Sequence, residues 1–216
     1  MKVPKLGFIY CSGTWVHGSS LEPVNDLMPV GTADAPTPSV ELTAWRPKLE
    51  QVILASSDVL DVMVVRPALV YGRSGAIWSM LFGPIIGASK SGSSVAEIPV
   101  DPGCRTGLIH VDDFGSGFHA AIDKLPLIAG TGVYPIFDLV TCQESMRDIL
   151  DAVAREVGFK GTVQMKGAGD HPFVKAVSTS SNTTGARART ILGWEPKKSG
   201  FVSGMDVYAR AWAAKL

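Results

Sequence analysis

The chain is organised around the sequence Val64-Val65-Arg66-Pro67-Ala68-Leu69-Val70-Tyr71-Gly72-Arg73-Ser74-Gly75. Its first residues continue an apolar run that begins at Val62, which predicts a buried strand. Pro67 has no amide hydrogen and cannot continue a central ladder, so we expect the strand to end there. The residues that follow then lie at the carboxyl end of the strand, where open α/β sheets hold their ligand crevice. The sequence therefore predicts either a binding site or a plain strand followed by a turn.

Composition and charge exclude several classes of partner. The chain has 216 residues, of which 46% are hydrophobic, and this is enough for the core of one ordinary domain. Its 20 basic and 20 acidic residues leave no net charge and form no basic cluster, which argues against nucleic acid and acidic membranes as partners. The first residues lack the apolar core of a signal peptide, and no stretch approaches the roughly 18 apolar residues of a membrane span. We therefore expect a cytoplasmic protein.

Cysteine usage agrees with a reducing compartment. Cys11, Cys104 and Cys142 are odd in number, far apart in the sequence, and contain no Cys-x-x-Cys pair. This pattern favours reduced thiols over a disulfide framework or a zinc site. We expect no metal.

A second strand is expected at 6–11, and its end carries candidate chemistry. The run from Leu6 is apolar, β-branched and aromatic, which is typical of a buried parallel strand. Hydroxyl groups follow at Ser12 and Thr14, with Trp15 and His17 next to them. These hydroxyls either take part in a site or satisfy local backbone groups.

The stretch 19–42 is rich in Pro, Ser, Asp and Gly, and we interpret it as a substrate-side lid. The helix that follows ends near Ser57, with Pro47 in its first turn. Lys48 then lies near the helix N-terminus, where the macrodipole disfavours a cation, so it either reaches solvent or has another role. The apolar face of this helix is predicted from helical spacing to contain Trp45, Leu49, Val52 and Ile53.

Helices and strands continue to alternate through the rest of the chain. Helical spacing predicts helices over 76–86, 112–122, 144–157, 185–192 and 202–213, and short apolar runs predict strands at 108–111, 134–140 and 163–165. The third of these helices is closed by Gly158. His110 and Asp112 lie two residues apart, which is compatible with a metal pair but also with a packed His and an Asp that caps the helix.

Together these pieces resemble the extended and atypical short-chain dehydrogenase/reductase superfamily, of the NAD-dependent epimerase/dehydratase type. Five blocks occur in the family's order and cover most of the chain: Phe8-Ile9-Tyr10-Cys11-Ser12-Gly13-Thr14-Trp15-Val16-His17-Gly18, Trp45-Arg46-Pro47-Lys48-Leu49-Glu50, Val65 to Arg73, Arg105 with Ile109 to Phe114, and Ala186 to Pro196. Each block alone is a weak signal, whereas their joint order is specific.

The resemblance implies an α/β fold: an incomplete Rossmann-like parallel sheet with helices on both faces, plus a small C-terminal α/β substrate-binding part. We assign residues 1–125 to the NAD(P)-binding domain and residues 126–216 to the substrate side. Family members begin with a Gly-rich turn that holds the pyrophosphate of the cofactor, and this sequence contains none. The chain thus resembles the carboxyl-terminal part of a family member, and its cofactor is expected to be NAD or NADP.

The resemblance also implies catalytic roles. Family members use a Ser or Thr after the fifth strand, a Tyr as general acid/base, and a Lys that binds the nicotinamide ribose and lowers the pKa of the Tyr. Lys48 matches the Lys, but Ala44 stands where the family has Tyr. Ser12 and Thr14 are the nearest candidates for the hydroxyl, and Tyr71 is a candidate substitute for the missing proton donor.

Further residues are implied in binding. Cys11, Ser12, Lys48, Arg66, Pro67 and Tyr71 are expected on the cofactor side. The family's hydroxyl position falls on Gly13, which with Trp15, His17 and Arg105 is expected on the substrate side.

Three hypotheses remain open at this point. The first is an NAD(P)-dependent oxidoreductase that acts on a small carbonyl or alcohol, with a homodimer as a possible assembly. The second is a non-catalytic protein that keeps a dinucleotide pocket or has a regulatory role. The third is a truncated product that cannot fold alone, because lost parallel strands would expose an edge prone to aggregation.

Overall fold

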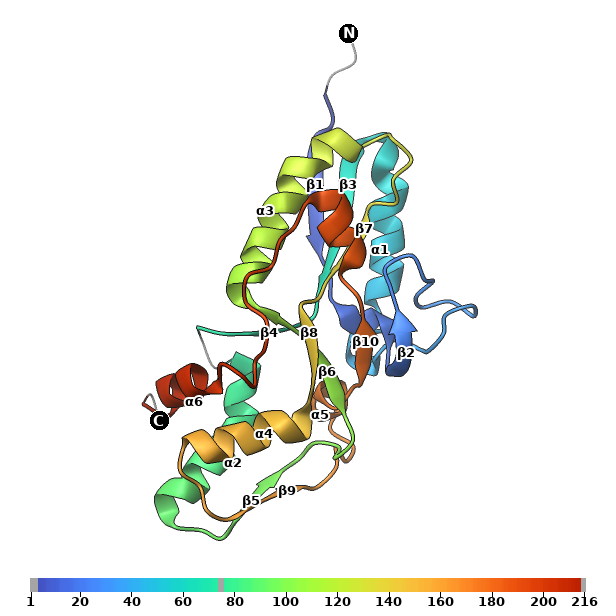
Figure 1. Ribbon diagram of the computed structural model, residues 1–216. Helices are drawn as coiled ribbons and strands as arrows, with labels where there is room; N and C mark the ends of the chain where they lie inside the picture. The colour runs from blue at the N-terminus through green and yellow to red at the C-terminus, as the bar shows by residue number, and fades with distance from the viewer. Residues whose placement is uncertain (1–3, 74–75, 215–216) are drawn as a thin grey trace.

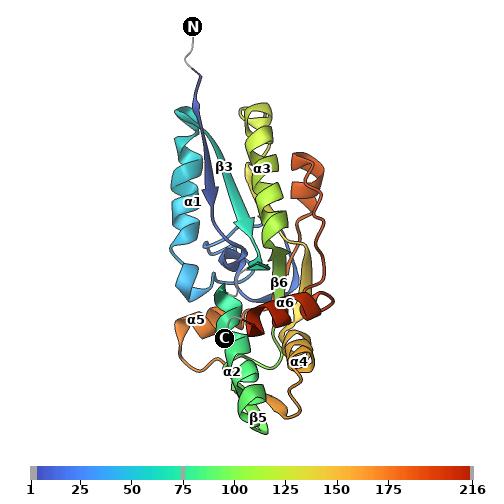
Figure 2. The same cartoon turned by 90° about the vertical axis from the view of Figure 1, so that its left-hand side faces the viewer.

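The structure, a computed structural model, describes residues 4–73 and 76–214 (Figure 1). Three strands, β1 (Leu6–Cys11), β3 (Leu60–Pro67) and β7 (Ile136–Leu139), form a parallel sheet in the order β1-β3-β7, here called the first sheet. Helix α1 (Arg46–Ala55) covers one face and helix α3 (Val111–Ile128) covers the other (Figure 2). This is the Rossmann-like layering that the sequence predicts.

The apolar run in β3 is explained by cores on both of its faces. Met63 and Val65 share a hydrophobic cluster with Leu125 of α3, whereas Val62 and Val64 share another with residues of α1. Successive side chains of a strand point to opposite faces, so a strand covered on both faces has no polar alternation. The strand ends at Pro67, as predicted.

A second sheet begins directly after this proline. Its strands are β4 (Leu69–Tyr71), β6 (Arg105–His110) and β8 (Cys142–Ser145), in the order β4-β6-β8 with the last pair antiparallel. Helices α2 (Ala76–Ser91), α4 (Met146–Glu156) and α6 (Met205–Ala213) contribute to the same large core. That core is rich in aromatic rings, among them Trp78, Phe82, Phe201 and Trp212.

The remaining elements are short. Strand β2 (Ser20–Val24) pairs in parallel with β10 (Ser181–Thr183), and β5 (Val95–Ile98) pairs with β9 (Thr162–Met165). Helical turns lie at η1 (Thr14–His17), η2 (Glu41–Thr43), η3 (Ser56–Asp58) and η4 (Ala188–Leu192), and helix α5 spans Pro172–Val177.

Two strands, β2 and β1, differ from the prediction. The stretch 19–42 contains a strand, β2, because it pairs with β10 from the far end of the chain. Strand β7, which follows residue 125, pairs with β3, which precedes it. Strand β1 is not buried as predicted: it is the outer strand of the first sheet as described, and Leu6 is 72% exposed.

Helix α1 buries a face that differs in part from the one predicted. In α1 the buried residues are Pro47, Glu50 and Ile53, while Trp45 and Val52 are each 56% exposed. The predicted apolar face is therefore right at Leu49 and Ile53, which pack in the cluster with Val62, and wrong at the two exposed residues. Helical spacing cannot reveal that a charged residue, Glu50, also faces inward. Large apolar residues are also exposed in two other helices, at Met80 in α2 and Ile122 in α3.

The cap of α3 also differs from the prediction. Its N-cap is His110, whose Nδ1 accepts a hydrogen bond from the amide of Asp112 at 3.1 Å. Asp113, in the first turn of the helix, accepts hydrogen bonds from the amides of Lys197 and Lys198, both at 2.7 Å. The carboxylate thus holds the segment that leads to α6.

Other features concern membranes, metals and thiols. No helix in the described ranges is long and apolar enough to cross a membrane. Within the same residues, no group of three or more His, Cys, Asp or Glu side chains is arranged to hold a metal ion. Cys11, Cys104 and Cys142 all lie in the described part of the chain and are free thiols.

Candidate functional site

A pocket of about 400 Å³ lies where β1 and β3 end and the second sheet begins, and we call it the Ser12 pocket. Both strands deliver their carboxyl ends to it, through Ser12 after β1 and Pro67 at the end of β3. This is the position at which parallel α/β sheets bind ligands. Its lining comprises Ser12, Gly13, Thr14, Trp15, Leu42, Thr43, Trp45, Arg46, Pro67, Ala68, Leu69, Val70, Gly72, Ile77 and Val111.

Two polar groups at this pocket have no partner. The Ser12 amide donates to the carbonyl of Val65 at 2.8 Å, which fixes the backbone at the end of β1. Its Oγ is shielded from solvent and has no hydrogen-bond partner among the described residues. The same holds for Nε of Arg46, the first residue of α1. Buried polar atoms without partners are rare in native proteins and indicate a place for a ligand or water.

The structure brings together five of the residues that the sequence singled out. Ser12, Gly13, Thr14, Trp15 and Pro67 all line the pocket. Ser12 and Thr14 are 6% and 5% exposed, so their hydroxyls belong to its inner part. A Cβ added at Gly13 would meet only the carbonyl oxygen of Pro67, at 3.8 Å, so the position has room for a side chain.

Lys48 and Ala44 lie outside this lining. Both are exposed, and Lys48 is on α1 two residues beyond Arg46. Cys11 is exposed as well, and its carbonyl accepts a hydrogen bond from Nη1 of Arg46 at 3.3 Å. Burial of its sulfur raises the pKa of the Cys11 thiol.

Tyr71 points away from the pocket into the aromatic core. It is 1% exposed, and its ring stacks on Phe201 with centroids 4.3 Å apart. Its hydroxyl donates to the carbonyl of Lys198 at 3.2 Å. Burial raises the pKa of Tyr71. The structure therefore does not bring this hydroxyl to a substrate in the Ser12 pocket, where the sequence suggested it as a proton donor.

His17 and Arg66 belong to a buried charge network rather than to the lining, and we call it the Arg66 network (His17, Glu50, Arg66 and Asp138). Nε of Arg66 donates to Glu50 at 3.1 Å, and Nη1 lies 3.9 Å from Asp138. His17 Nε2 lies 2.9 Å from Asp138. Burial opposes the charge on Arg66, but the two carboxylates outweigh it and raise its pKa. All four side chains are at most 5% exposed.

A second buried carboxylate extends this network. Asp26 is 1% exposed, accepts a hydrogen bond from the amide of Asp138 at 3.1 Å, and pairs with Arg187 at 3.0 Å. Burial and the neighbouring Asp138 raise its pKa. No sequence signal marks Asp26, because an Asp in a Pro-rich stretch is ordinary in a loop.

Arg105 lies apart from the Ser12 pocket. It is exposed at the start of β6 and lines a separate, mainly polar pocket of about 240 Å³ with Ser20, Leu21, Gln143, Ser181 and Asn182. The structure thus does not gather the expected substrate residues in one cavity.

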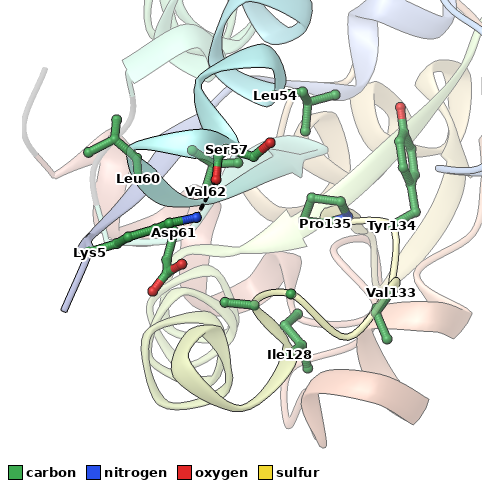
Figure 3. Close-up of a pocket in the computed structure, with 12 residues that line it drawn as sticks. Lys5, Leu54, Ser57, Leu60, Asp61, Val62, Ile128, Val133, Tyr134 and Pro135 are labelled. Atoms are coloured by element: carbon green, nitrogen blue, oxygen red, sulfur yellow. Dashed lines mark hydrogen bonds between the residues drawn. The ribbon is translucent and has the colours of Figure 1, made fainter. Parts of the chain in front are cut away.

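A larger cavity of about 530 Å³ lies at the opposite end of the first sheet (Figure 3). It is lined by residues at the amino ends of β1 and β3, and Figure 3 shows Lys5 donating to the carbonyl of Ser57, at 2.6 Å. None of the residues that the sequence singled out lies here, and the amino ends of parallel strands are not where this architecture binds ligands. We therefore take the Ser12 pocket as the candidate site.

Comparisons with known proteins bear on the fold. No protein-family model matches the chain, and no curated protein sequence matches it. Solved structures, in contrast, do match the chain. UDP-glucuronic acid 4-epimerase from Bacillus cereus, in complex with UDP-glucuronic acid and NAD, matches with a TM-score of 0.67 and 20% identity, over 97% of this chain and 62% of that one.

Two further solved structures match in the same way. RMD from Pseudomonas aeruginosa, complexed with NADPH, has a TM-score of 0.68 and 17% identity, over 97% of this chain and 66% of that one. dTDP-glucose 4,6-dehydratase from Bacillus anthracis, in complex with NAD, has a TM-score of 0.66 and 17% identity, over 97% of this chain and 62% of that one.

These matches define a fold class. The chain has the Rossmann-like α/β fold of NAD(P)-dependent epimerases and dehydratases, which confirms the fold inferred from the sequence blocks. It spans about 62% of the length of the epimerase and dehydratase that it matches. At this level of identity the likeness concerns the fold alone.

Sequence reasoning missed part of the site. Arg46, Trp45 and Thr43 line the Ser12 pocket, although none was singled out as a site residue. A signal was present, because Trp45 and Arg46 open the second of the matching blocks. The family pattern, however, marks Ala44 and Lys48 in this region and not Trp45 or Arg46.

Proposed function

We propose that the chain forms the nicotinamide and substrate side of an NAD(P)-dependent oxidoreductase of the epimerase/dehydratase type, acting on a small carbonyl or alcohol. The observation that carries this proposal is the Ser12 pocket: it lies at the carboxyl ends of two parallel strands, and Ser12 Oγ in it has no partner. Solved structures with this fold are complexed with NAD or NADPH.

The residues present fit one end of such a cofactor. An apolar wall at Pro67, Ala68 and Leu69 suits a nicotinamide ring, and an exposed cation at Lys48 suits a ribose. No Gly-x-x-Gly-x-x-Gly turn for a pyrophosphate occurs in the sequence. When bound, NAD(P) supplies or accepts a hydride.

The chain's own residues then act on the substrate oxygen. The hydroxyls of Ser12 and Thr14 hydrogen-bond to it and orient it, while the apolar walls exclude water. With Ala44 at the position of the family Tyr, the proton exchanges with solvent through a hydroxyl. Loss of a positioned general acid costs on the order of 10²–10⁴-fold in rate, so we expect slow turnover.

A second candidate is a protein that binds the dinucleotide or a related ligand without turnover. Ala44 favours it, and so does the chemistry of the lining. Among the described residues that form the Ser12 pocket, Arg46 is the sole ionisable side chain, so the lining offers no carboxylate, imidazole, thiol or phenol as a general acid or base.

The decisive experiment measures binding and turnover on one preparation. NADH and NADPH are titrated calorimetrically into the chain, with a thermal melt alongside, and oxidation of NAD(P)H is followed against a panel of aldehydes and ketones. Saturable binding with a raised melting temperature and any saturable turnover would establish the oxidoreductase. Binding without turnover would favour the second candidate, and a folded chain that binds neither cofactor would refute both.

Lys48 gives a specific prediction within this experiment. Removing a charged hydrogen-bond donor costs about 1.5–3 kcal/mol, so Lys48→Ala is expected to weaken the affinity for NAD(P)H about 10–100-fold. Because Lys48 is exposed, the melting temperature should not change. Lys90→Ala, at an exposed position in the last turn of α2, is the matched control. Equal affinities of the two variants would remove Lys48 from the cofactor site.

A further inference from the structure

The walls of the Ser12 pocket are unlike a site for a sugar. Its side chains include Leu42, Leu69, Val70, Ile77 and Val111, together with the indoles of Trp15 and Trp45. A sugar carries hydroxyl groups on every side, and each needs a hydrogen-bond partner when it is buried. Besides the two indole N–H groups, the polar side chains on offer are Ser12, Thr14, Thr43 and Arg46, and the Thr43 hydroxyl already donates to the carbonyl of Val40. The pocket therefore fits a compound that is mainly apolar.

The indoles indicate an aromatic or flat compound. Trp15 is half-buried and packs against the large core, so its ring is held in place. Trp45 is 56% exposed, and the guanidinium of Arg46 lies over its ring at 5.0 Å. A large aromatic side chain exposed at the rim of a pocket presents a stacking surface that a ligand ring can cover.

The unpartnered atoms indicate the polar end of the compound. Arg46 Nη1 lies 3.5 Å from the hydroxyl of Tyr10 and 3.3 Å from the carbonyl oxygen of Cys11, which places the guanidinium beside the end of β1. Ser12, the next residue, presents a buried hydroxyl without a partner, and Nε of Arg46 also has none. Arg46 and Ser12 line the same pocket, so a charged N–H donor and a hydroxyl are available there for a carboxylate and for a carbonyl oxygen of one ligand.

We propose that the substrate of the Ser12 pocket is an aromatic carbonyl acid, with its carboxylate on Arg46, its carbonyl oxygen on Ser12, and its ring between Trp15 and Trp45. This inference rests on the proposed function and narrows its substrate class. It also separates this chain from the solved structures of the same fold, one of which is complexed with UDP-glucuronic acid.

Binding of four probes to the whole chain tests the proposal. Phenylpyruvate carries the ring, the carbonyl and the carboxylate; phenylacetaldehyde lacks the carboxylate, pyruvate lacks the ring, and UDP-glucose represents nucleotide sugars. Quenching of tryptophan fluorescence reports occupancy, and calorimetry gives the affinity. We expect phenylpyruvate to bind most tightly, with a loss of about 10-fold or more when either the carboxylate or the ring is removed. Tighter binding of UDP-glucose would overturn the proposal.

Variants assign the two ends of the ligand. Arg46→Gln is expected to weaken phenylpyruvate binding about 10-fold or more and to leave phenylacetaldehyde binding unchanged, because only the acid needs the cation. Arg189→Gln, at an exposed arginine outside the pocket, should change neither. Trp45→Leu, at a residue more than half exposed, should weaken both aromatic probes and leave pyruvate unchanged. An Arg46→Gln variant that binds phenylpyruvate like the parent protein contradicts the proposal. A Trp45→Leu variant that binds phenylpyruvate like the parent protein contradicts it as well.

The same preparations are titrated with NADPH, so that the two proposals fail separately. Phenylpyruvate binding that depends on Arg46, without any NAD(P)H binding, would keep this inference and refute the oxidoreductase. NADPH binding without selectivity for phenylpyruvate would do the reverse.

Discussion

The Ser12 pocket and the Arg66 network share three segments of the chain, yet they differ in chemistry. After β1, Ser12 lines the pocket and His17 joins the network. On α1, Arg46 lines the pocket and Glu50 pairs with Arg66. At the end of β3, Pro67 lines the pocket, whereas the preceding Arg66 is buried in the network.

The difference is that charges are concentrated where no ligand reaches. In the Arg66 network the guanidinium of Arg66 faces the carboxylates of Glu50 and Asp138, which joins β3 to α1 and β7. His17 joins η1 to Asp138. Arg66 Nη1 and Asp138 Oδ1 make no hydrogen bond in the described structure, but the groups that face them are charged side chains of opposite sign. The Ser12 pocket has hydroxyls, indoles and one arginine with an unpartnered nitrogen. A residue's chemical type alone is thus a poor guide to the site, and its burial and partners are a better one. Three predictions about stability test this difference between the Ser12 pocket and the Arg66 network.

The largest effect is expected in the network. Arg66→Met leaves the carboxylates of Glu50 and Asp138 buried without their cation, and breaking a buried pair in this way costs about 3–5 kcal/mol of unfolding free energy. Urea unfolding measures the loss. The control is Arg73→Met, because Arg73 pairs with Asp112 at 2.7 Å but is 76% exposed, and an exposed pair contributes at most about 1 kcal/mol. Equal losses in the two variants would show that the network is not structural.

Much of the fold behind this comparison follows from local sequence. The end of β3 at Pro67 follows from the missing amide hydrogen, and Pro47 in the first turn of α1 follows from proline geometry. The helix predicted at 144–157 is observed at Met146–Glu156, with Gly158 at a φ of 69° directly after its C-cap. In each case the signal and the structure lie within a few residues of each other.

The features that were missed depend on partners far away in the sequence. Strand β2 exists because β10 pairs with it, and Glu50 faces inward because Arg66 neutralises it. The pairing of Asp26 with Arg187 is equally remote. The site was predicted only at positions that a family pattern marks, so Ser12 and Thr14 were found while Arg46 and Trp45 were not.

A smaller effect is expected in the pH dependence of stability, beside the pocket. His110 is 4% exposed and packs against Gly72 of the lining. Burial lowers its pKa from 6.5, against the opposing effect of Asp112 and Asp113. The unfolded chain therefore binds a proton at His110 more readily than the folded chain does. The contribution of neutral His110 to the unfolding free energy is fully present above about pH 6.5 and is lost as the pH falls below that value. The slope is at most about 1.4 kcal/mol per pH unit.

Two variants isolate this contribution. His110→Asn keeps an N-cap side chain but does not titrate, so unfolding free energies measured from pH 7 downwards should lose that part of the slope. His119→Asn, on the same helix with a side chain that is 77% exposed, should keep it. A slope that is the same in both variants and the parent would exclude His110 as its source.

The smallest effect is expected in the pocket itself. The buried Ser12 hydroxyl makes no hydrogen bond in the structure as described, so its desolvation is uncompensated in the free protein. Ser12→Ala removes that cost, and the unfolding free energy should stay within about 0.5 kcal/mol of the parent or rise slightly. Thr43→Val supplies the contrast, since the Thr43 hydroxyl donates to Val40 at 3.2 Å and its loss should cost about 1 kcal/mol. A Ser12→Ala variant as destabilised as Thr43→Val would mean that this hydroxyl holds the fold, and the pocket would then resemble the network instead of differing from it.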